Sequence, residues 1–449
     1  MNPFSYIAIN LINKIISPKP RVFEGGTLLG HIVGENGPTC QPYYVTPAKR
    51  TEHMPVMGKT GMGKSFFLRN LMQQDIKAGH GFICFDIHGD LISPTLRFMA
   101  ACGMDPEKVI VIDPTNRDYA VGLNPLEATN ETDRFRQIME VTRTIVEPWG
   151  FKGARTEELL RNALYVLSEN GLTLLELSLL LASDSYRATL LKNVTNVDVR
   201  EYFELRFDPL SDAMKATMRE PVLNKLGEFT SDPHFRFILG QRESTIFFDE
   251  IVNSGLTVFV NISKGTLGIY GPLLGALIYG KLKASIFRRR SRNLFTIYAD
   301  ELQNLVSEDT DFDVLFSESR KYGVSVVTAN QFGAQLPAKL RSAIQAIGTR
   351  VFFQLSAEDA EQVARDISGG KNMADRLKNL PPRHFIAKQG SNRPYEVVTQ
   401  EVVTAKTPAA ELYAASHALH ATSREEIMRD ILARRPRPSQ LKEALNEWE

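Results

Sequence analysis

The sequence predicts an α/β fold in which a mostly parallel central sheet is interrupted by an all-helical insertion. Short apolar runs alternate with helical stretches from residue 53 to about 125, and strand-like runs return from residue 255 onward. This alternation is typical of parallel strands joined by crossover helices. Between the two parts, from about 130 to 240, apolar residues recur at helical spacing throughout.

The elements are expected in the following order. A β-hairpin is predicted over 27–45, where two strand-like runs flank a turn containing Gly34, Asn36, Gly37 and Pro38. A helix is predicted over 64–78, because its apolar pattern stops at Gly79. The predicted strands of the sheet are 55–58, 81–86, 109–114, 256–263, 294–301, 324–331 and 349–356.

These elements divide the chain into five expected segments. They are 1–50 (N-terminal helix and β-hairpin), 51–126 and 250–404 (two parts of one α/β domain), 127–249 (all-α insertion domain) and 405–449 (charged C-terminal tail). The tail is rich in alanine and arginine, and its acidic and basic residues balance from residue 422 onward. We interpret it as a partner-docking helix rather than as an arm that binds a polyanion.

The composition limits the function classes. The chain has 449 residues, 43% of them apolar, and a net charge of +1, so it is not a protein that coats nucleic acid through bulk charge. Any DNA contact must be local. The three cysteines, Cys40, Cys84 and Cys102, lack metal-ligand spacing and support neither a disulfide framework nor a zinc site. They favour a reducing cytoplasm.

The N-terminal run over 4–16 is apolar but is interrupted by Asn10, Asn13 and Lys14. It is shorter than the roughly twenty residues of a membrane-spanning helix and lacks the features of a signal peptide. We interpret it as an amphipathic helix packed on the body, with a membrane-surface anchor as the alternative. No transmembrane segment is predicted, and we expect a cytoplasmic protein that is at most peripheral at the inner membrane.

Residues 58–65 read GKTGMGKS, a complete G-x-x-x-x-G-K-[ST] phosphate loop. Its glycines let successive N–H groups point at phosphate oxygens, and the following helix adds its partial positive charge. Lys64 would reach the β- and γ-phosphates and Ser65 would ligate Mg²⁺. The residues expected to bind ATP are Gly58, Lys59, Thr60, Gly61, Met62, Gly63, Lys64, Ser65 and Phe66.

A second half of the site is predicted where the strand over 294–301 ends in Asp300 and Glu301. In a parallel sheet, acids at the carboxyl end of a buried strand lie beside the phosphate loop. Asp300 would hold Mg²⁺ and Glu301 would orient and deprotonate the attacking water. The alternative, a strand that simply ends at solvent, is disfavoured by the intact loop upstream. Asp86 and Asp90 would either support the site or cap the next helix.

Two further residues are candidates for the reaction. Gln331 follows the strand-like run VSVVTAN and would hydrogen-bond the γ-phosphate or the water, unless it is an ordinary turn residue. Arg320, in the segment SRKYG, would stabilise charge on the transferred phosphate in its own site or in a neighbour's. A solvated helix end is the alternative for Arg320. The arginine run over 288–292 is either a helix end that complements its dipole or a DNA contact.

With these segments placed, the chain resembles the type IV coupling-protein branch of the FtsK–HerA superfamily of DNA translocases. The matching segments lie within about 27–404 and come in the family's order. The phosphate loop is shared with many ATPases, whereas the combination of DIHGDL, DELQN and RKYG followed by NQ is far more specific. The matching segments are HMPVMGKTGMGKS, FICFDIHGDL, VIVIDPTN, VGLNPLE, VNISKGTLG, YADELQNL, SESRKYGVSVVTANQF and RVFFQLSAEDAEQVA.

The resemblance implies a RecA-like P-loop NTPase domain, a hexameric ring with ATP sites between subunits, and a central DNA channel. It implies Mg²⁺ and ATP as cofactors, and DNA (in single-stranded form), a relaxase or other secretion substrate, and type IV secretion components as partners. Family roles transfer to Gly58, Gly63, Lys64, Ser65, Asp300, Glu301 and Gln331, and less directly to Arg320. Coupling proteins usually begin with two membrane-spanning helices, which this sequence does not show, so membrane anchoring is in doubt.

The function we expect is therefore a DNA-stimulated, Mg²⁺-dependent ATPase that delivers DNA or a relaxase–DNA complex to a type IV secretion channel. The alternatives are an ATPase that energises protein export or pilus assembly, a DNA-processing translocase outside conjugation, and a nucleotide-gated docking platform. The intact Lys64 and Glu301 argue against the platform, because a scaffold needs no hydrolytic residues. The chain is expected to form a homo-hexameric ring, and to be a monomer when DNA is absent.

Overall fold

The computed structural model describes residues 26–34, 37–149, 153–301, 312–331, 338–345, 347–368 and 370–435. Within these residues, an 11-stranded sheet runs in the order β2-β1-β12-β11-β10-β3-β9-β8-β4-β7-β5. The part from β10 to β5 is parallel, whereas β11, β12, β1 and β2 pair antiparallel. This confirms the predicted α/β fold with a mostly parallel sheet. The helix predicted over 4–16 lies outside the described residues.

Every predicted strand is present, and the predicted β-hairpin and the helix ending at Gly79 are present as well. The parallel strands are β3 (Met54–Met57), β4 (Gly81–Asp86), β5 (Val109–Ile112), β7 (Thr257–Asn261), β8 (Phe295–Asp300), β9 (Val324–Asn330) and β10 (Thr349–Phe352). The antiparallel strands are β1 (Thr27–Gly34), β2 (Gly37–Val45), β11 (His384–Gln389) and β12 (Tyr395–Thr399).

Helices cover both faces of this sheet, so the parallel strands are apolar on both sides. Along β8, Phe295 and Ile297 belong to the apolar cluster that contains α14, whereas Tyr298 belongs to the cluster that contains α3. The covering helices include α3 (Lys64–Ala78) and α4 (Ile92–Ala101) on one face, and α12 (Phe248–Ser254), α14 (Tyr270–Phe287) and α15 (Phe312–Glu318) on the other. Further short helices are α2 (Pro47–Arg50), α13 (Lys264–Leu267), α16 (Ala338–Gln345), α17 (Ala357–Asp366) and α18 (Gly370–Lys378).

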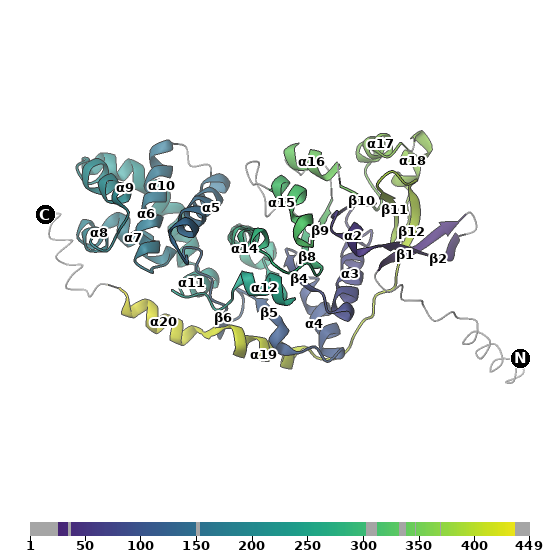
Figure 1. Cartoon of the computed structure of the whole chain (residues 1–449), viewed down its shortest axis with the longest axis horizontal. Helices are drawn as coiled ribbons and strands as arrows, with labels where there is room; N and C mark the ends of the chain where they lie inside the picture. Colours follow the sequence, from purple (N-terminus) through teal and green to yellow (C-terminus); the bar gives the residue numbers. More distant parts are fainter. Residues whose placement is uncertain are drawn as a thin grey trace, which may run out of the picture.

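The segment between β6 (Tyr119–Ala120) and α12 is helical, as the periodicity predicts, and it lies beside the sheet in Figure 1. Its apolar side chains join the same cluster as α14, so its core is continuous with one side of the sheet. The exact domain boundaries stay a prediction. The helices are α5 (Glu131–Trp149), α6 (Ala154–Glu169), α7 (Leu177–Ala182), α8 (Asp184–Leu191), α9 (Val197–Glu201), the π-helix Tyr202–Phe207, α10 (Asp212–Ser231) and α11 (Pro233–Leu239).

The described part of the expected C-terminal tail differs from an isolated docking helix. Its elements are α19 (Ala410–His420), β13 (Thr422–Ser423) and α20 (Arg424–Ala433), which run along the sheet and on to the helical segment in Figure 1. β13 pairs with β6, and Ile427 and Ile431 are buried. Arg434 lies 3.2 Å from Glu176 of the helical segment. This segment docks on its own chain because its apolar residues face the core.

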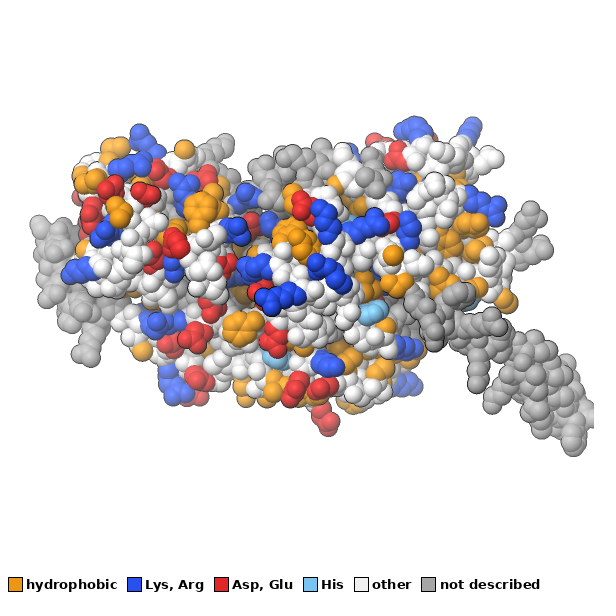
Figure 2. All heavy atoms as spheres, in the orientation of Figure 1, with side chains coloured by type: hydrophobic (Ala, Val, Ile, Leu, Met, Phe, Trp, Pro, Cys, Tyr) orange, Lys and Arg blue, Asp and Glu red, His pale blue; other side chains and the backbone are white. Residues whose placement is uncertain are grey.

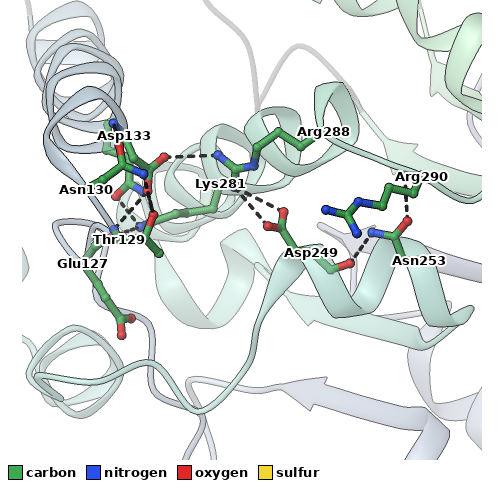
Figure 3. A network of polar contacts seen from close by, with 10 residues as sticks. Glu127, Thr129, Asn130, Asp133, Asp249, Asn253, Lys281, Arg288 and Arg290 are labelled. Carbon is green, nitrogen blue, oxygen red and sulfur yellow. Dashed lines mark hydrogen bonds and ion pairs between the residues drawn. The ribbon is translucent and has the colours of Figure 1, made fainter.

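The arginine run over 288–292 lies at the amino end of β8, and two of its members are tied into the fold. Arg288 bridges Asp133 of α5 (3.1 Å) and Asp249 of α12 (3.2 Å), as Figure 3 shows. Arg289 is 4% exposed and donates to the carbonyl oxygens of Val252, Asn293 and Tyr322. Arg288 and Arg289 therefore join neighbouring elements, which neither sequence interpretation of the run included.

Charged side chains are unevenly spread over the surface. On the face in Figure 2, Lys and Arg side chains gather from the region of α14 across to that of α2. Since the net charge is only +1, this positive charge is local. Among the described residues, none of the helices combines the length and the apolar character needed to cross a membrane.

Candidate nucleotide site

The phosphate loop joins the carboxyl end of β3 to the first residue of α3, Lys64. Gly61 and Gly63 have φ of 80° and 108°, backbone conformations that residues with a Cβ adopt only under strain. A Cβ on Gly58 would lie 2.5 Å from the Cβ of Phe353. The motif's glycines are therefore required by the backbone, and the free N–H groups at the N-terminus of α3 are suited to bind an anion.

Lys64 closes over this loop. Its Nζ donates to the carbonyl oxygens of Gly58 (2.6 Å) and Lys59 (3.1 Å), and the residue is 8% exposed. Burial lowers the pKa of Lys64, while the negative charges of Glu301 and Asp300 act in the opposite direction. The two acids are therefore close enough to the loop's lysine to influence its charge.

The register of three adjacent strands brings the acids to the loop. Met57 of β3 pairs with Asn330 of β9, and Ala329 of β9 pairs with Asp300 of β8. The carboxyl ends of β3 and β8 are thus level and two strands apart, a separation of roughly 10 Å. The sequence prediction that the loop and the acid pair share one edge of the sheet agrees with this geometry.

Asp300 and Glu301 lie in an acidic, buried setting. Asp300 is 2% exposed, and its Oδ2 has no hydrogen-bond partner among the described residues. Burial raises the pKa of Asp300 to about 7, with Asp90, Glu301 and Asp86 adding to the rise and His88 opposing it. Glu301 has a φ of 53° and donates its backbone N–H to Ala329 O at 2.7 Å.

The site fits a divalent cation that also binds a nucleotide. The buried Oδ2 of Asp300 has no described hydrogen-bond partner, and burial and the neighbouring acids destabilise its negative charge. A bound cation would stabilise that charge. Within the described part of the chain, no group of three or more His, Cys, Asp or Glu residues is arranged to hold a metal on its own. Ser65 and Asp300 are the residues that could hold such an ion, together with phosphates and water, which is how Mg²⁺ is usually bound.

A family model described as "Helicase HerA, central domain" matches residues 28–266, just over half of the chain. The chain belongs to this HerA family. The predicted resemblance to the FtsK–HerA superfamily is thereby confirmed at the level of the family. A search among curated proteins gives no match.

Solved structures resemble this HerA-family chain in fold. The bacterial conjugative coupling protein TrwBdeltaN70 has a TM-score of 0.60 and 16% identity, covering 89% of this chain and 93% of that chain. The plasmid coupling protein TrwB with ADP and Mg²⁺ has a TM-score of 0.59 and 16% identity, covering 89% and 94%. VirB4 of Thermoanaerobacter pseudethanolicus has a TM-score of 0.53 and 14% identity, covering 84% and 96%. The predicted RecA-like P-loop NTPase fold is confirmed.

In this HerA-family site, Asp86 has the capping role that the sequence left open. Its carboxylate accepts the backbone N–H groups of Gly89 (2.8 Å), Leu91 (3.0 Å) and Ile92 (3.0 Å) at the start of α4. Sequence reasoning missed His88, whose Nε2 lies 3.9 Å from Glu301 Oε1. Nothing in the spacing of the DIHGDL segment indicates a contact with an acid far along the chain.

Gln331 and Arg320 lie at opposite edges of the sheet. Gln331 follows Asn330, whose carbonyl oxygen accepts the N–H of Gly58 at 3.1 Å, so it lies at the carboxyl edge between loop and acids. Arg320 precedes β9 and pairs with Glu52, before β3, at 3.1 Å. It lies at the amino edge, away from its own phosphate loop. The hypothesis to test is therefore that Arg320 acts in the site of a neighbouring copy.

Arg383 is a neighbour of the loop that the sequence did not indicate. Its backbone N–H donates to Met62 O at 2.8 Å, and its guanidinium lies 4.1 Å from the centre of the Phe66 ring. Arg383 precedes β11, a strand for which the sequence gave no signal. The loop is therefore supported from a segment more than three hundred residues downstream.

Proposed function

We propose that this HerA-family chain is a Mg²⁺-dependent ATPase that moves DNA, or a relaxase–DNA complex, toward a type IV secretion channel. The observation that supports this most is the placement of the phosphate loop and the buried acids at one edge of the sheet. A loop alone binds nucleotide, whereas hydrolysis also needs a metal ligand and a group that activates water. Candidates for both are present at this edge.

Each candidate residue has a distinct task in this proposal. The loop backbone and Lys64 bind the phosphates, and Ser65 and Asp300 hold Mg²⁺. The ion, when bound, neutralises charge on the phosphoryl group that is transferred. Glu301 accepts a proton from the attacking water. Gln331 hydrogen-bonds the γ-phosphate or that water, from the strand between the loop and the acids.

The relatives support the coupling role and the cofactors. One similar structure is of a bacterial conjugative coupling protein, and another is of a plasmid coupling protein with ADP and Mg²⁺. We extend from them ATP and Mg²⁺ as cofactors, and DNA, a relaxase and type IV secretion components as partners. An ATPase for protein export or pilus assembly would use the same site, so the track on which the motor acts is what distinguishes the two functions.

A ring of six copies accounts for the position of Arg320. In the head-to-tail ring that we propose, the amino edge of one sheet would face the carboxyl edge of the next. The Arg320 side chain is 58% exposed at that amino edge, so it is accessible to a neighbour's phosphates. There its charge would stabilise the transferred phosphoryl group in trans.

The test is the ATPase rate per subunit against protein concentration, measured without nucleic acid, with single-stranded DNA and with double-stranded DNA. Sites completed by a neighbour should give a rate per subunit that rises with concentration, and single-stranded DNA should raise it further. Arg320→Ala should remove the concentration dependence. An ATPase rate that does not change with DNA but rises with a secretion component would favour the export function. The absence of hydrolysis under all of these conditions would overturn the proposal.

A further inference from the structure

A buried polar cluster lies between α3 and the sheet. We call it the Arg50 cluster, and it consists of Thr27, Arg50, Asp75, Thr296 and Tyr298. Arg50 and Tyr298 are 0% exposed and Asp75 is 1% exposed. Arg50 Nη2 lies 3.0 Å from Asp75 Oδ2, 2.9 Å from Thr296 Oγ1 and 3.2 Å from the Tyr298 hydroxyl. The Tyr298 hydroxyl in turn donates to Asp75 Oδ2.

Asp75 and Arg50 keep their charges in this cluster although both are buried. Burial alone would raise the pKa of Asp75, yet the charge of Arg50 and the hydrogen bonds from Tyr298 and Arg50, with His80 Nδ1 3.6 Å away, bring it below its usual value. A buried ion pair of this kind adds little stability over apolar side chains of the same volume, because desolvation offsets the attraction. What it provides is one defined geometry between the elements that carry it.

Two of those elements, α3 and β8, also carry the candidate nucleotide site. Asp75 lies on α3, eleven residues after Lys64, which is about 16 Å along the helix axis. Tyr298 lies on β8, two residues before Asp300, and on the same face of the strand. One hydrogen bond thus joins the helix that begins with Lys64 and Ser65 to the strand that ends in Asp300.

We propose that the Arg50 cluster positions α3 against β8 and thereby sets the spacing between the phosphate-binding end of α3 and the acids of β8. Asp75 and Tyr298 are then positioning residues for hydrolysis. This inference rests on the proposed ATPase function. Hydrolysis depends steeply on this spacing, since a displacement of about 1 Å costs roughly a hundredfold in rate. Nucleotide binding depends mainly on the loop, which the cluster does not touch.

The test compares Tyr298→Phe, which removes only the hydroxyl, with Tyr270→Phe as the control. Tyr270 of α14, on the other face of the sheet, also donates to a carboxylate, that of Glu228 on α10 of the helical segment. For each variant we would measure the melting temperature, the dissociation constant for ATP and kcat. Tyr298→Phe should lower kcat by roughly 10- to 100-fold with a dissociation constant within about threefold of the parent. Tyr270→Phe should change neither.

Three results separate the outcomes. Hydrolysis by the parent protein tests the proposed function, and its absence would remove the basis of both proposals. With an active parent, a Tyr298→Phe variant that melts earlier but keeps its kcat would show a purely structural cluster and overturn the inference. Parallel losses in kcat and ATP binding would overturn it too. If Tyr298→Phe fails to fold, Thr296→Val, which removes one bond to Arg50, should show the same split more weakly.

Discussion

His53 joins the start of β3 to the strand β9 and the helix α15. The residue is 2% exposed and has a φ of 67°. Its Nδ1 accepts the backbone N–H of Val326 at 3.1 Å, and its Nε2 lies 2.8 Å from Phe316 O. Since Nδ1 must accept, the ring is neutral with its proton on Nε2. Burial, as the largest cause, lowers the pKa of His53 to about 4.

This histidine should make stability depend on pH. Its pKa is about 4 in the folded protein against a usual value of 6.5, so its contribution is full above pH 6.5 and is lost as the pH falls toward 4. The loss is of the order of 3 kcal/mol. Urea unfolding from pH 7.5 to 4.5 should show a smaller decline for His53→Asn, because asparagine tolerates the backbone and does not titrate. Identical declines for the two proteins would contradict this assignment.

Asp300 should be needed for function but should not stabilise the fold. Its buried carboxylate has an oxygen without a described partner and a raised pKa, so a neutral amide at this position should be tolerated or should raise the melting temperature. Asp300→Asn should nevertheless lose the part of its nucleotide affinity that depends on Mg²⁺. Calorimetric titration with ATP, in Mg²⁺ and in EDTA, measures this difference. A variant whose affinity still responds to Mg²⁺ like the parent's would exclude Asp300 as a ligand.

At the scale of elements, the phosphate loop is fixed by contacts with strands that come later in the chain. A Cβ on Gly58 would meet Phe353 of the segment after β10 at 2.5 Å. Gly58→Ala should therefore shift the loop and weaken nucleotide binding by tenfold or more. Gly227→Ala, within α10, is the matched control, because a Cβ there meets nothing within 4 Å. This substitution should raise the free energy of unfolding by roughly 0.5–1 kcal/mol, since alanine is the better helix former.

The two glycine variants are compared by ATP binding and by urea unfolding. The account expects Gly58→Ala to lose affinity and Gly227→Ala to gain stability without losing affinity. Equal affinities in the two variants would show that the close approach to Phe353 does not shape the loop.

The elements that the sequence predicted are those with a strong local pattern. Strands β4, β5, β7, β8 and β9 are continuous apolar runs because helices cover both faces of the sheet. By contrast, β11 and β12 mix polar and apolar residues at the antiparallel edge, and α19 and α20 carry charge on exposed faces. Their positions are decided by contacts with distant segments, such as Arg434 with Glu176, which no local pattern records.

For the whole molecule, the sheet's topology is what turns separate motifs into one candidate site. The loop and the acids are more than two hundred residues apart in sequence, and the rule that parallel strands end at a common edge was enough to predict their meeting. The contributions of His88, Arg383 and the Arg50 cluster were not predictable. Each depends on which side chain of a distant element reaches across the fold, and no residue type or spacing signals that.

The central claim is that the loop and the acids of β8 act on one nucleotide, and the most direct measurement is ATP binding and turnover on Glu301→Gln beside Lys64→Ala. Glu301→Gln should bind ATP with Mg²⁺ as the parent does and lose turnover by about 10²- to 10⁴-fold, because a base is removed but the loop is intact. Lys64→Ala should lose both. Turnover by Glu301→Gln at the parent's rate would contradict the account.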